Sequence, residues 1–138
     1  MAGYDQPLRI TYPYPALAFG GASSSSTIKP PRGKKQATIE EIHVGVTVLF
    51  TAVTTPAFIR LGYSADHDYY AELNMGTAAA SAGYGTSDIT ASNPIFRKID
   101  LESDPVPGVL TGVLVNFVAA TGGSPAGTGT VAITLGWY

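Results

Sequence analysis

The sequence contains no cysteine, little charge and little histidine. Of its 138 residues only 13% are charged and two are histidine, whereas typical globular domains carry roughly 25% charged residues. The absence of cysteine excludes disulfides, thiolate metal ligands and cysteine nucleophiles. The sparse charge indicates that part of the surface is not meant to face bulk water.

Long apolar runs and a strong net charge are also missing. The formal net charge is −2, which generates no global field that would attract nucleic acid or an anionic membrane. Thr, Gly, Asn and Pro interrupt the least charged stretches, and none offers the roughly 18 apolar residues that a membrane helix needs. The opening "MAGYDQPLRI" has no apolar core of a secretory signal. We therefore expect neither nucleic acid nor membrane as a partner.

Proline and serine dominate residues 1–35. Pro13, Pro15, Pro30 and Pro31 favour extended backbone, and the run of four serines favours a flexible connection. The pattern predicts a possible edge strand at residues 8–12 and an extended arm over residues 13–35, with a disordered tail as the alternative.

Aromatic and basic residues give this arm its candidate partner-binding side chains. Disordered segments are poor in aromatics, so Tyr12, Tyr14 and Phe19 favour an arm that buries its rings on its own domain or on a neighbour. Lys34 and Lys35 belong to the basic stretch "KPPRGKK", which is either a contact for an acidic surface or a solvated linker.

Residues 36–138 have the pattern of a β domain. Ile42, Val44, Val46, Val48 and Phe50 recur at period two and would line one face of a strand. Two β-rich runs flank "TGGSPAGTG", which predicts a closing hairpin. No window shows a convincing helical period. The predicted fold is all-β: a jelly-roll-like sandwich over residues 36–138, preceded by the N-terminal arm.

The stretch "GYSADHDYYAE" at residues 62–72 combines acidic, histidine and tyrosine side chains. On a strand, Asp66 and Asp68 would share a face and His67 would point away, and the spacing does not fit a calcium loop. A structural role is favoured: Ser64 caps a short helical turn, or a strand runs from Tyr69 to Met75. Both interpretations end the preceding strand at Tyr63.

Catalytic patterns are incomplete. "GYSAD" has Asp66 where a nucleophile elbow needs its last glycine, and "GYGTSD" and "AGTGT" lack the glycine and helix of a phosphate loop. His43 and His67 are too few for a zinc site or a cupin-type metal centre, and His43 is expected to pack on its strand. We expect no enzyme activity, no cofactor and no metal.

The chain resembles the small capsid cement, or decoration, proteins of tailed bacteriophages. The resemblance depends on "RLGYSADHDYYAELNMG", on "GVLVNFVAATGGSPAGTGTVAITLGWY" and on the N-terminal arm. It implies a jelly-roll-like domain on the outer surface of the virion head, bridging major capsid protein subunits and stabilising the assembled shell. On this interpretation Tyr12, Tyr14 and Phe19 are anchors, and Lys34 and Lys35 meet acidic capsid surface.

Two further expectations stay open. Tyr63, Tyr69, Tyr70 and Tyr84 would suit a carbohydrate- or receptor-binding sandwich of a phage tail or fibre. The stretch from Pro105 to Tyr138 has no charged residue, and strand alternation sends about half of it outward. We therefore expect a homo-oligomer, with a trimer slightly favoured over a dimer.

Overall fold

The computed structural model describes residues 6–75, 82–85, 98–102 and 112–138, and these contain β-strands and no helix. The strands are β1 (Leu8–Ala18), β2 (Ser24–Ile28), β3 (Gln36–Val48), β4 (Phe58–Tyr63), β5 (Asp66–Asn74), β6 (Ala82–Gly85), β7 (Ile99–Asp100), β8 (Val113–Val118) and β9 (Thr128–Trp137).

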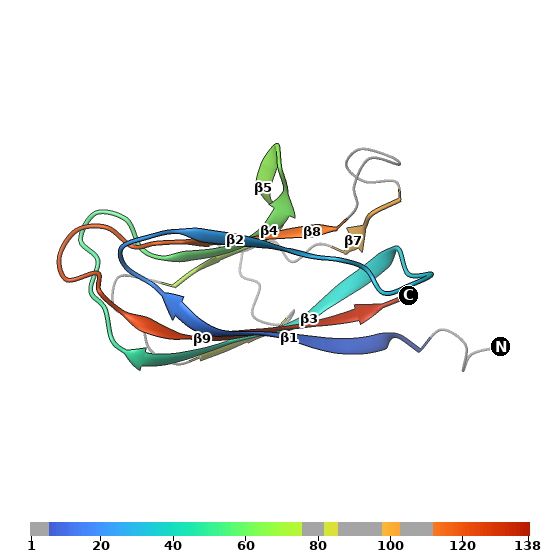
Figure 1. The fold of residues 1–138 in the computed structure, drawn as a ribbon, viewed down its shortest axis with the longest axis horizontal. Helices are drawn as coiled ribbons and strands as arrows, with labels where there is room; N and C mark the ends of the chain where they lie inside the picture. The colour runs from blue at the N-terminus through green and yellow to red at the C-terminus, as the bar shows by residue number, and fades with distance from the viewer. Residues whose placement is uncertain (1–5, 76–81, 86–97, 103–111) are drawn as a thin grey trace.

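The strands form two antiparallel sheets that pack face to face (Figure 1). The first sheet has the order β1-β9-β3-β6, with the short β7 also paired to β3, and the second has the order β2-β8-β4-β5. The chain crosses between the sheets at most of its connections, so that strands distant in sequence become neighbours. This strand order is that of a jelly roll. The prediction of an all-β jelly-roll sandwich is confirmed.

Alternating apolar residues build the core between the sheets. On β3, Ile42 and Val44 point inward opposite Ile133 and Val131 of β9, and all four are buried. The closing strand ends on Trp137, which is fully buried. Its indole Nε1–H donates a hydrogen bond of 2.8 Å to the hydroxyl of Tyr12. The C-terminal strand is thereby tied to the N-terminal one.

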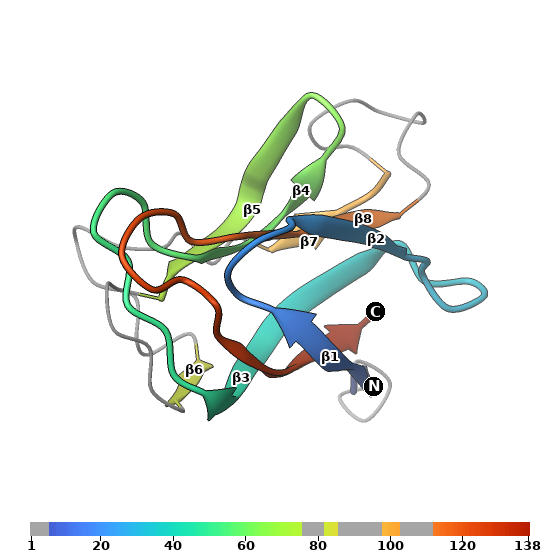
Figure 2. The ribbon, with the colours of Figure 1, turned by 60° about the vertical axis from the view of Figure 1, so that its left-hand side comes forward.

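The N-terminal segment belongs to the sandwich, which corrects the predicted arm and the domain boundary at residue 36. β1 pairs with β9 from Leu8 to Ala18, and the serine run forms β2, which pairs with β8 (Figure 2). β1 is an edge strand, as predicted for residues 8–12, but it continues through both prolines. An edge strand tolerates proline because one side of its backbone needs no partner.

Two local predictions are also corrected. β8 and β9 do not form a hairpin, because β8 lies in the second sheet and β9 in the first, so residues 119–127 carry the chain between the sheets. No helical turn follows Ser64; of the two alternatives the strand is the one found, although it begins at Asp66 rather than at Tyr69. β4 ends at Tyr63 as predicted, and β5 begins at Asp66 after a tight turn. The true hairpin of the second sheet is therefore β4–β5.

Candidate functional site

The three predicted aromatic anchors pack within the chain's own sandwich. Phe19 is buried, with its ring centroid 5.7 Å from that of Phe50. Tyr14 meets the ring of Phe117 edge-on at 4.9 Å, and Tyr12 accepts the bond from Trp137. Of the two predicted alternatives, burial on the chain's own domain is the one found. Contacts within the chain therefore hold these rings, and their role as partner anchors stays a prediction.

The predicted basic residues lie on the loop between β2 and β3. The Lys35 ammonium forms an ion pair of 2.9 Å with Glu102, and its backbone carbonyl accepts a bond from the Leu101 amide. Lys34 is half-buried, and its amide bonds to the Pro31 carbonyl. The loop thus packs against residues 98–102 rather than forming a free linker.

Side chains of the β4–β5 hairpin, which includes the acidic cluster at residues 66–72, contact one another. The guanidinium of Arg60 pairs with Glu72 at 2.7 Å and lies 4.7 Å from the ring centroid of Phe58. A hydrogen bond to Asp66 is the main cause that holds the pKa of Asp68 below its usual value. In the described part of the chain, no three acidic or histidine side chains gather closely enough to hold a metal ion.

Three of the tyrosines expected for a carbohydrate site, Tyr63, Tyr69 and Tyr70, do not form an open platform. Tyr63 and Tyr69 meet edge-on at 5.7 Å, and Tyr69 meets Tyr70 at 5.2 Å. Tyr70 is fully buried. The side chain of Tyr84 lies outside the described residues. His43, which was expected to pack, is exposed on β3.

Within the described residues, charge is unevenly distributed along the long axis of the sandwich. Residues 10–28, 42–59 and 112–138 contain no aspartate, glutamate, lysine or arginine. They supply loops 19–23, 49–57 and 119–127, which gather at one end (at the left in Figure 1). We call these three loops the uncharged end. At the opposite end, loop 29–35 and residues 98–102 carry Lys29, Arg32, Lys34, Lys35, Lys98, Asp100 and Glu102.

Backbone hydrogen bonds between the loops give the uncharged end a defined shape. The amides of Thr51 and Ser124 each bond to the other's carbonyl at 3.0 Å. The Phe19 amide bonds to the Gly127 carbonyl at 2.8 Å, which joins the third loop. Gly122 and Gly123 have φ of 79° and 65°, a left-handed conformation that suits glycine. The end is therefore preorganised rather than assembled from loose loops.

Large apolar side chains are exposed at this end. Leu49 and Val53 are 70% and 73% exposed, and Val48 at the end of β3 is 51% exposed. The alternation of β3 predicted an inward Val48, but a register shift between Val46 and Val48 turns it outward. Sequence reasoning missed this site. Its signal was the charge-free stretch from residue 42 to residue 59.

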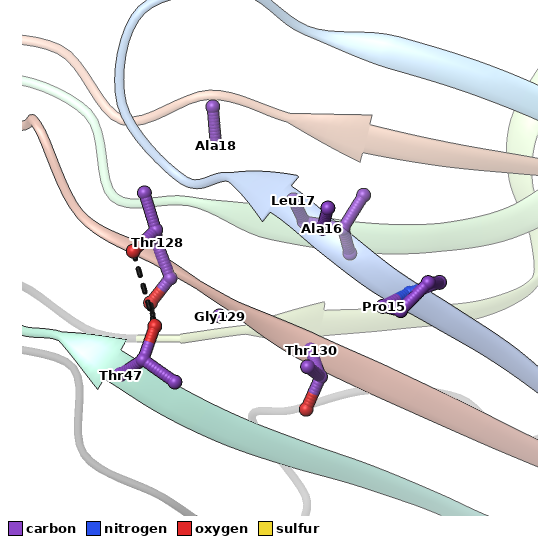
Figure 3. A pocket seen from close by; sticks show the side chains of 8 residues that line it. All are labelled: Pro15, Ala16, Leu17, Ala18, Thr47, Thr128, Gly129 and Thr130. Atoms are coloured by element: carbon purple, nitrogen blue, oxygen red, sulfur yellow. Dashed lines mark hydrogen bonds between the residues drawn. The ribbon is translucent and has the colours of Figure 1, made fainter.

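A hollow of about 370 Å³ adjoins the uncharged end on the outer face of the first sheet (Figure 3). It opens where the pairing of β1 with β9 shifts between Tyr14 and Leu17. The Thr47 hydroxyl donates to the Thr128 carbonyl at 3.1 Å along its border. Its lining is neutral and consists of Pro15, Ala16, Leu17, Ala18, Thr47, Thr128, Gly129 and Thr130.

The threonines of the closing strand continue this neutral surface. Thr128 and Thr130 are exposed and Thr134 is half-buried. The hydroxyls of Thr134 and Thr11 lie 2.9 Å apart. Thr111, which lies in the same uncharged stretch from Pro105 to Tyr138, is outside the described residues. Neutral side chains of this kind suit a close, partly wet protein interface.

Comparisons with known proteins add little. No family model and no curated protein sequence matches the chain. A solved structure titled "Desmodium yellow mottle tymovirus" is similar to it at a TM-score of 0.28 and 16% identity, over 96% of this chain and 82% of that chain. A TM-score this low does not establish a shared fold. The assignment of the fold therefore depends on the strand order itself.

Proposed function

We propose that this chain is a structural protein of a virus particle, a capsid cement protein that binds major capsid subunits on the outer surface of the head. The observation that carries the proposal is the uncharged end. Leu49 and Val53 are exposed there on loops joined by backbone hydrogen bonds, beside the exposed Val48 at the end of β3. Exposed apolar side chains grouped in this way are typical of a protein-binding surface.

The chemistry of this end favours a protein partner. Burial of apolar surface contributes about 25 cal/mol per Å², and no charge has to be stripped of water at the same time. Interface cores are depleted of charged residues in the same way. A cement protein stabilises a shell because it binds assembled subunits better than free ones, so that dissociation of the shell must also remove the bound copies. Many modest contacts are enough when many copies act together.

The test changes the charge of the uncharged end. In the double variant Leu49→Lys/Val53→Lys, co-sedimentation with assembled heads should show at least about tenfold weaker binding, because two charges would be buried without partners. Leu8→Lys is the matched control: Leu8 is 46% exposed and pairs with Trp137, at the end of β9 away from the uncharged end. Both proteins should melt at the wild-type temperature.

Two outcomes would contradict the proposal. One is unchanged binding of heads by the Leu49→Lys/Val53→Lys variant. The other is a protein found only at the tail tip, with heads that lack it as resistant to heat and osmotic shock as complete ones. The receptor- or carbohydrate-binding function would then replace the cement function.

A further inference from the structure

The edges of the two sheets differ in how they resist pairing with another strand. β1 carries Pro13 and Pro15 and a register shift near its end, and all three features block further strand addition. β5 carries Asp66, His67, Asp68 and Glu72, and charges also protect an edge. Both edges are therefore guarded.

β2 is an edge without such protection. The segment Ser24–Ile28 contains no proline and no charge, and it pairs with β8 without a register shift. Its first four residues are exposed. Among the described residues, β2 ends the strand order of the second sheet, so one side of its backbone has no strand partner there. An exposed edge of this kind is a template for pairing with another chain.

Contacts with neighbouring segments of the same chain hold the exposed edge strand β2 in place. The ring of Tyr14 packs edge-on against Phe117, which lies opposite Ser24 in the β2–β8 pairing. The Ser23 hydroxyl accepts a 2.9 Å bond from the Ala119 amide just before the strand begins. A fixed edge loses little conformational freedom when it pairs, which favours association.

We propose that β2 pairs antiparallel with β2 of a second copy of this chain, about a two-fold axis. The two four-stranded sheets would then form one continuous sheet across the dimer. A two-fold axis places each segment opposite itself, so that a charged strand would meet its own charge. The segment Ser24–Ile28 is neutral, and serine and threonine hydroxyls both donate and accept hydrogen bonds.

A second copy fits this edge better than an unrelated peptide. Pockets give a foreign strand its specificity, and the hollow beside β2 is lined in part by the small side chains of Ser24 and Ser25. Small hydroxyl side chains of this kind match their own kind across an axis. Ser25 lies opposite Asn116 and Thr27 opposite Leu114 in the β2–β8 pairing, so both project from the same face. Cross-strand Ser/Thr pairs are among those that stabilise antiparallel strands.

The experiment is sedimentation velocity over a range of concentrations. The wild-type protein should show a dimer that grows with concentration. The variants Ser25→Lys/Thr27→Lys and Ser25→Glu/Thr27→Glu should each dimerise about tenfold more weakly, because like charges face each other. An equimolar mixture of the two variants should restore the dimer. Ser64→Lys is the control, because Ser64 is exposed on the turn between β4 and β5.

Each of three sedimentation results would overturn the proposal: a strict monomer at every concentration, unchanged dimerisation of the lysine variant, or a mixture no better than its components. Capture of an extended peptide by monomers alone would assign β2 to a different partner and also overturn it. The dimer does not depend on the cement function, because Leu49→Lys/Val53→Lys should weaken head binding and leave dimerisation unchanged.

Discussion

The contact between Tyr12 and Trp137 joins the two ends of the chain through one hydrogen bond. Trp137 is fully buried, and its Nε1–H has the Tyr12 hydroxyl as acceptor at 2.8 Å. A buried N–H without an acceptor costs about 1–3 kcal/mol. We expect Tyr12→Phe to reduce the free energy of unfolding by about that amount, as measured by urea denaturation. Tyr138→Phe, an exposed control, should change it little.

Tyrosine ionisation should weaken the fold at alkaline pH. Burial raises the pKa of Tyr12, partly offset by the bond from Trp137, and burial also raises the pKa of Tyr14. A raised pKa means that the folded protein holds these protons more tightly than the unfolded one. The stability they contribute is therefore complete below pH 10, the ordinary tyrosine value, and is lost as pH rises above it. A Tyr12→Phe/Tyr14→Phe protein should show a shallower loss of melting temperature above pH 10.

At the scale of elements, β1 and β2 contribute to both sheets and to the core. β1 covers β9, and β2 covers β8 and brings the buried Ile28. A folded domain is stable by only roughly 5–15 kcal/mol. Two strands and Phe19 together contribute more free energy of folding than that. We expect a protein without residues 1–28 to lose cooperative unfolding by circular dichroism.

In the isolated wild-type protein, the β1 amides bonded to β9 should resist hydrogen exchange. Free hydrogen exchange of these amides would instead support the predicted extended arm.

The elements show what sequence patterns can and cannot supply. Alternation identified β3, the β-rich run after "TGGSPAGTG" identified β9, and the cluster at residues 62–72 correctly ended β4 at Tyr63. The prediction for the serine run is wrong because its strand depends on pairing with β8, which lies far away in sequence. The loop at residues 119–127 carries turn signals, but turn signals do not say whether the flanking strands share a sheet. The exposed Val48 depended on a register shift that alternation cannot reveal.

At the scale of the whole molecule, the two ends of the sandwich offer two different kinds of contact. The uncharged end exposes Leu49 and Val53. Salt does not weaken the binding free energy that burial of such apolar side chains contributes. The opposite end offers the loop with Lys34 and Lys35, and one of these lysines is already paired with Glu102. Exposed charges are screened over about 10 Å at 0.1 M salt. Salt therefore separates the two modes of docking.

Head binding by the wild-type protein should change less than about twofold between 50 and 500 mM NaCl, and sulfate should strengthen it, because sulfate favours apolar burial. Lys34→Glu/Lys35→Glu tests the other end: if the uncharged end docks alone, this variant should bind heads as the wild type does. Binding that falls steeply with NaCl and is abolished in the glutamate variant would instead assign docking to the basic loop. The measurement is co-sedimentation with purified heads at each salt concentration, with Leu49→Lys/Val53→Lys beside it to show the loss expected when the apolar contact is broken.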